Sequence, residues 1–190
     1  KAESLEKLKK SISNIKNCEL KKGATNIVFA DGNSKSKIML VGEGPGSNED
    51  QEGLPFVGRA GALLDKMLAS IDLDRKNVYI TNVVNYRPPE NRRPTEEEIK
   101  RYLPYLKKHI EIISPKIVVL LGSTAMNALI DNSEVISKVR GRWIEKKIGE
   151  CKISMIVTFH PAFLMRQPAQ KNMAWIDLKM IREKKLKLKI

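Results

Sequence analysis

Residues 37–46 read KIMLVGEGPG, an apolar, β-branched run that ends in a glycine-rich turn. Three further runs of the same kind follow along the chain, at 78–84 (VYITNVV), 116–121 (KIVVLL) and 154–159 (SMIVTF). Segments with helical periodicity separate them, and 61–71 and 95–113 each place apolar residues on one face. Apolar strands that alternate with helices are typical of a buried parallel sheet. We therefore predict an α/β fold of three layers, α/β/α, with a central four-stranded parallel sheet.

Local signals refine this prediction. Thr95 precedes three glutamates, so it is a suitable N-cap for the helix that spans 95–113. Residues 146–152 (KKIGECK) predict a β-hairpin that turns at Gly149 before the last strand. No linker and no internal repeat interrupts the 190 residues, so we expect a single domain over 1–190.

The composition narrows the class of protein. Lys and Arg number 35 against 22 Asp and Glu, and the net charge of +13 favours a polyanionic partner, although a generally lysine-rich protein is the alternative. No apolar run approaches the ~20 residues that span a bilayer, which argues against an integral membrane protein. Two cysteines, Cys18 and Cys151, cannot form a disulfide framework and favour a reducing cytoplasm.

Ligands of open parallel sheets bind beyond the carboxyl ends of the strands. The predicted strands lead there into Gly42 and Glu43, into the loop after Asn82, into Gly122 and into His160. The turn at Gly42 is not a dinucleotide fingerprint, because Ser47 stands where the third glycine belongs. We therefore expect a carboxylate, two amides and an imidazole to converge on one crevice without a bound nucleotide cofactor.

Each of these side chains also has a structural interpretation. Glu43 could project into the crevice or be solvated in an ordinary turn. His160 could donate a hydrogen bond to a developing anion or be satisfied by a backbone carbonyl. The other histidine, His109, lies beside two lysines in an amphipathic segment and is expected at the surface. Neither histidine has a partner at metal-ligand spacing, so no metal site is expected.

Asn82, Phe56 and the segment after His160 suggest contacts with a nucleic acid base. An amide inside an apolar strand is costly unless hydrogen-bonded, and it offers the donor and acceptor needed to read a base edge. Phe56 could stack on such a base or pack in the core. Residues 163–166 (FLMR) could insert into stacked bases or form the first turn of a buried helix.

Together these segments resemble the family 4 uracil-DNA glycosylases over nearly the whole chain. The similar segments occur in the family's order, and they are EGPG at 43–46 with Glu49 and Asp50, GLPFVGRAG at 53–61, TNVV at 81–84, RPP at 87–89 with Asn91 and Arg92, VRG at 139–141 and HPAFLMR at 160–166. The resemblance implies base-excision repair of DNA, in which deoxyuridine is flipped out and its N-glycosidic bond is hydrolysed.

The resemblance also implies roles for individual residues. Glu43 would position water, His160 would stabilise the anion at uracil O2, and Asn91 would support the water or the pocket loop. Gly42, Phe56 and Asn82 would bind uracil. Contacts to DNA would come from Arg59 and from the segment after His160, namely Leu164, Met165 and Arg166.

The chain departs from the family at the four cysteines that usually hold an iron–sulfur cluster. Only Cys18 is retained, and the other positions fall on Ile15, Tyr86 and Tyr102 or its neighbour. One thiolate cannot replace four ligands, so we predict a protein without the cluster and without any other cofactor. Tyr86 and Tyr102 are expected to fill the vacated volume and pack against each other, or else to point to solvent in a looser region.

A second hypothesis is a catalytically weak DNA-binding module of the same fold. Both hypotheses predict binding that weakens with salt, whereas only an enzyme needs Glu43 and His160. As a repair enzyme the protein would be a cytoplasmic, nucleoid-associated monomer that acts on uracil-containing DNA.

Overall fold

A computed structural model of the chain describes residues 1–131 and 134–190. At its centre lies one six-stranded sheet in the order β1-β3-β2-β4-β6-β5. The four inner strands are mutually parallel, which confirms the predicted parallel core, while β1 and β5 add antiparallel edges that the four-stranded prediction lacked. The strands are β1 Asp31–Gly32, β2 Ile38–Gly42, β3 Tyr79–Asn82, β4 Ile117–Leu121, β5 Trp143–Ile148 and β6 Cys151–Thr158.

Of the two edge strands, β5 can be predicted from the sequence and β1 cannot. The predicted hairpin joins β5 to β6 and turns at Gly149, whose φ of 58° suits glycine. Because β6 pairs with β5 from its first residue, it begins at Cys151, before the apolar run. In contrast, β1 has only two residues, too few for any periodicity to reveal.

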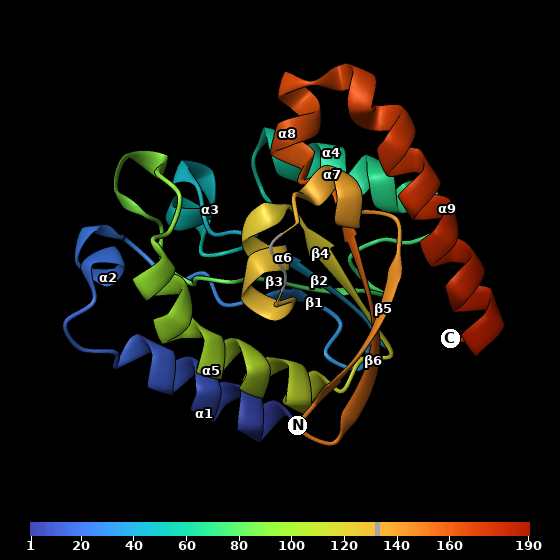
Figure 1. Cartoon of the computed structure of the whole chain (residues 1–190). Helices are drawn as coiled ribbons and strands as arrows, with labels where there is room; N and C mark the ends of the chain where they lie inside the picture. Colours follow the sequence, from blue (N-terminus) through green and yellow to red (C-terminus); the bar gives the residue numbers. More distant parts are fainter. Residues whose placement is uncertain (132–133) are drawn as a thin grey trace.

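Alternation along the strands builds a core on both faces of the sheet. In β2, Met39 and Val41 join the cluster packed under α1, α5 and α6, whereas Ile38 and Leu40 join the cluster under α4, α8 and α9. The two helical layers lie on opposite sides of the strands, as Figure 1 shows, so the three-layer prediction is confirmed. The helices are α1 Ala2–Ser13, α2 Glu19–Gly23, α3 Ser47–Glu52, α4 Arg59–Ala69, α5 Glu96–Ile113, α6 Ser123–Leu129, α7 Ile136–Val139, α8 Pro161–Arg166 and α9 Lys171–Leu188, with 3₁₀ turns at Pro89–Asn91 and Pro168–Gln170.

Helix α5 confirms one prediction and corrects another. Thr95 caps it, since its hydroxyl accepts the amide N–H of Glu98 at 3.1 Å. The expectation that His109 is solvated is wrong, because this side chain is 2% exposed. Its Nε2 lies 2.7 Å from the Tyr79 hydroxyl, and its ring stacks on Phe29 at 4.5 Å. Burial lowers the pKa of His109 to about 3, so the imidazole is neutral within the core.

The length and hydropathy of the helices show whether any of them could span a membrane. None of the helices in the described parts of the chain is long and apolar enough to cross a bilayer.

Candidate active site

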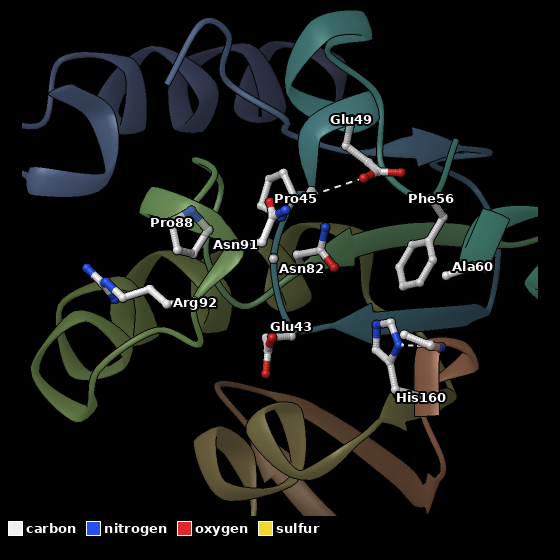
Figure 2. A pocket seen from close by; sticks show the side chains of 13 residues that line it. Glu43, Pro45, Glu49, Phe56, Ala60, Asn82, Pro88, Asn91, Arg92 and His160 are labelled. Carbon is white, nitrogen blue, oxygen red and sulfur yellow. Dashed lines mark hydrogen bonds between the residues drawn. The ribbon is translucent and has the colours of Figure 1, made fainter. Parts of the chain in front are cut away.

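The predicted crevice lies at the carboxyl ends of the parallel strands. Strand β2 runs through Gly42 into Glu43, β3 ends at Asn82, and β6 leads into His160. Since β2 has β3 on one side and β4 on the other, connections diverge at this edge and leave an opening. A cavity of about 210 Å³ occupies it, and the side chains that line it together include Glu43, Phe56, Asn82, Asn91 and His160 (Figure 2).

Gly42 lets two walls of this cavity approach each other. A Cβ atom at this position would lie 2.5 Å from Asn82 Oδ1 and 2.6 Å from Phe56 Cζ, both well inside van der Waals contact. Any larger residue would therefore push the amide or the ring out of place. The Phe56 ring in turn lies 5.4 Å from the His160 ring at an interplanar angle of 29°, so the two rings form one wall.

Phe56 is held in an unusual backbone conformation, with φ at 55°. Glu49 fixes the following residues, since its Oε2 accepts the amide N–H groups of Val57 and Gly58, each at 2.9 Å. Arg75 fixes the preceding ones by donating to the carbonyl of Pro55 at 2.9 Å and to that of Phe56. These contacts offset the cost of the strained backbone and give the aromatic wall a defined position.

Asn82 carries an unsatisfied hydrogen-bonding atom. The residue is 3% exposed, and its Oδ1 is the one buried side-chain N or O atom in residues 1–131 and 134–190 that has no partner. An unpaired buried acceptor costs about 1–3 kcal/mol, so a native protein seldom keeps one without use. The amide oxygen is therefore suited to accept an N–H from a ligand that enters the cavity.

His160 is neutral and has one defined tautomer. Its Nδ1 accepts the backbone N–H of Ala162 at 3.0 Å, where it serves as the N-cap of α8. A neutral imidazole that accepts at Nδ1 carries its hydrogen on Nε2. Burial lowers the pKa of His160 to about 4, despite the opposing charge of Glu43. The ring therefore presents an N–H donor near neutral pH.

Glu43 is anchored by two residues that lie far from it in the sequence. The hydroxyl of Thr124 donates to Glu43 Oε1 at 2.5 Å, and Arg93 Nε lies 3.4 Å from the same oxygen. Sequence reasoning missed both partners. No local pattern marks them, because Thr124 is one of several polar residues after β4 and Arg93 belongs to a run of exposed cations.

Of the remaining predicted residues, Asn91 and Arg166 line the crevice or the cavity beside it, whereas Arg59 does not. Asn91 has φ at 57°, and its Oδ1 accepts from Arg87 Nε at 2.8 Å. Arg166 lines a second cavity of about 400 Å³, which shares Glu43 and His160 with the first. Arg59 is exposed at the start of α4 and lines neither cavity.

The structure corrects the expected role of Leu164. This side chain is 1% exposed and belongs to the core cluster under α4 and α8. It forms the first turn of a buried helix, which was the alternative interpretation of this segment, and is not available for insertion into DNA. Met165 is partly exposed and Arg166 is exposed, so these two remain the candidates for DNA contact.

The positions that correspond to the expected cluster ligands form a packed region instead. Ile15, Cys18, Tyr86 and Tyr102 are each 7% exposed or less and belong to one core cluster, so the tyrosines do not point to solvent. Cys18 Sγ lies 3.3 Å from the Tyr102 hydroxyl. Burial raises the pKa of both phenols, which keeps them protonated. One thiol, two protonated phenols and an alkyl group do not fit an iron–sulfur cluster that needs four thiolates.

Comparisons with known proteins show which sequences this chain is similar to. The model of the uracil DNA glycosylase superfamily matches residues 29–179. A type-4 uracil-DNA glycosylase of Sulfurisphaera tokodaii is 45% identical over 186 residues, which cover 95% of this chain and 84% of that protein. One from Archaeoglobus fulgidus is 41% identical over 185 residues, covering 95% and 93%. Another, from Thermotoga maritima, is 47% identical over 150 residues, covering 78% and 77%.

Proposed function

The chain belongs to the type-4 uracil-DNA glycosylases of the uracil DNA glycosylase superfamily, and we propose that it excises uracil through the crevice described above. The enzyme hydrolyses the N-glycosidic bond of deoxyuridine in DNA. Water supplies a hydroxyl to C1′ and a proton to the leaving base, so the products are free uracil and an abasic site. The nucleotide must first leave the base stack, at a cost of a few kcal/mol.

The unpaired Oδ1 of Asn82 is the observation that carries this proposal. It accepts the N3–H of uracil, while the amide nitrogen donates to O4, so the Watson–Crick edge of the base is read at two positions. Cytosine carries an acceptor at N3 and a donor at position 4, and it would oppose both groups of Asn82. Phe56 stacks on the bound base. Gly42, which has no side chain, leaves room for the base beneath the Phe56 ring.

His160 stabilises the departing base. As the glycosidic bond breaks, the sugar gains positive charge and uracil gains negative charge. The Nε2–H of a neutral imidazole donates to O2 and needs no prior proton uptake, which agrees with the lowered pKa of this residue. A preorganised donor of this kind is typically worth about 2.7–4 kcal/mol, or ~10²–10³ in rate.

Glu43 acts on the sugar side of the bond. Its carboxylate orients the attacking water and stabilises the cationic sugar. Asn91, which lines the same cavity, supports the water or the pocket loop. Arg59, Met165 and Arg166 contact the DNA strand on either side of the flipped nucleotide, and the net charge of +13 supports that attraction. We propose that the enzyme is a monomer and that it is cytoplasmic and associated with the nucleoid.

The enzyme carries out this chemistry without an iron–sulfur cluster. None of the proposed steps needs an electron carrier or a Lewis acid, since hydrogen bonds and a carboxylate supply the stabilisation. The protein packing around Cys18 and Tyr102 takes the place of the cluster in holding the first helices against α5. Purified protein is therefore expected to be colourless and free of iron.

The function is tested by excision from an oligonucleotide that holds one deoxyuridine, followed by alkaline cleavage at abasic sites. We expect His160→Ala and Glu43→Gln to lose turnover by at least ~10² while DNA binding is kept. Glu52→Gln is the matched control, because Glu52 is an exposed carboxylate outside the cavity. Wild-type protein that binds DNA with salt sensitivity but cleaves nothing would instead support the DNA-binding module.

A further inference from the structure

The hydroxyl of Thr124 lies between Glu43 and Arg93. Thr124 is 4% exposed, and its Oγ1 lies 2.5 Å from Glu43 Oε1 and 3.1 Å from Arg93 Nη2. The side chain of Arg93 is 68% exposed and that of Glu43 is 33% exposed, so the contact between the hydroxyl and the carboxylate is the better shielded of the two.

The direction of these hydrogen bonds is settled by donor counting. A guanidinium only donates, so Arg93 donates to the Thr124 oxygen. The hydroxyl has a single hydrogen, and the Glu43 carboxylate only accepts, so that hydrogen goes to Oε1. Charge assistance makes this contact short and strong. Both groups fix Oε1, whereas no residue within the described ranges donates a hydrogen bond to Oε2.

The local fold explains why Thr124 reaches this point. Strand β4 ends at Leu121, and Gly122 then adopts φ at 97°, which favours glycine. A Cβ atom at Gly122 would lie 3.1 Å from His160 Cβ, so this turn packs directly against the other candidate catalytic residue. Thr124 follows in the first turn of α6 and faces back into the crevice.

We propose that Thr124 is a positioning residue for Glu43, and this inference rests on the proposed role of Glu43 in hydrolysis. By fixing Oε1, the hydroxyl turns Oε2 toward the sugar and the attacking water. Without it the carboxylate could rotate about its side chain or pair with Arg93 alone, and the geometry needed for attack would be populated less often. The residue does not touch the base, so uracil binding is unaffected.

Thr124→Val tests this role, since valine has nearly the same shape and lacks the donor. Because a hydrogen bond to a charged group is at stake, we expect kcat to fall about 10- to 100-fold with KM unchanged. Thr124→Ser keeps the hydroxyl and is expected to restore most of kcat. Thr158→Val is the matched control, because Thr158 also donates to a buried carboxylate, that of Asp177, at 2.6 Å, but lies outside both cavities. It should lose stability without losing turnover.

A double variant separates this inference from the proposed function. If Thr124 acts through Glu43, adding Thr124→Val to Glu43→Gln causes no further loss of kcat. Full activity of Thr124→Val, an equal loss in the serine variant, or additive losses in the double variant would each overturn the positioning role. Wild-type protein that excises no uracil would instead overturn the proposed function.

Discussion

Replacing Asn82 by aspartate changes the hydrogen-bonding pattern of the base pocket and little of its shape. In the wild-type pocket, Oδ1 has no protein partner and is free to accept N3–H, while the amide nitrogen donates to O4. The carboxylate of Asn82→Asp offers two acceptors and no donor. The carboxylate therefore repels the O4 acceptor of uracil, whereas it can accept a hydrogen bond from the amino group of cytosine.

The size of the change follows from burial, because Asn82 is 3% exposed and solvent does not screen the mismatch. Each buried polar group left without its partner costs about 1–3 kcal/mol. Uracil loses one such contact and cytosine recovers one, so the preference for uracil should shrink by about 2–6 kcal/mol, or ~30- to 10⁴-fold.

The assay compares kcat/KM for oligonucleotides that hold a single deoxyuridine or a single deoxycytidine. Asn85→Asp is the matched control, since Asn85 is 4% exposed but donates to the carbonyl of Val28 and does not line the cavity. We expect it to keep the preference for uracil. An unchanged preference in Asn82→Asp would refute the reading of the base by Asn82 and leave the residue with a structural role.

Two further predictions concern residues behind the site. In the folded protein His109 stays neutral down to about pH 3, whereas in the unfolded chain its imidazole binds a proton below about pH 6.5. The free energy of unfolding therefore decreases as the pH falls from about 6.5 to about 3. The His109→Gln variant should take up about one proton fewer on unfolding in this pH range. The midpoint of urea unfolding should then depend less steeply on pH than in the wild-type protein. An identical pH dependence would contradict the buried, neutral state of His109. Arg75→Lys replaces a group that donates to the carbonyls of Pro55 and Phe56 by one that cannot span both, so KM should rise by about tenfold through a less ordered Phe56. An unchanged KM and unchanged inhibition by free uracil would show that Phe56 needs no such support.

The fold and the centre of the site could be predicted because their signals are local. Each parallel strand is an apolar run, and residues at or just after its carboxyl end enter the crevice because parallel strands end at one edge. Glu43, Asn82 and His160 thus come together in the structure as the strand order requires.

The rest depends on contacts that sequence spacing does not reveal. His109 is flanked by lysines, and its burial depends on Phe29 and Tyr79, which reach it from other elements. Thr124 lies 81 residues from Glu43, so nothing local marks it as a partner. Leu164 was ambiguous for a different reason: an apolar residue beside a cation is equally typical of an insertion wedge and of a buried helical turn.

We propose that this crevice excises uracil without the iron–sulfur cluster of its family. The most direct test measures iron content and uracil excision on the same purified sample, before and after treatment with a strong iron chelator. We expect only trace iron, no visible absorbance, and the same rate of excision in both samples, with that rate abolished by His160→Ala. Stoichiometric iron in the purified protein, or activity that disappears with the chelated metal, would contradict this expectation.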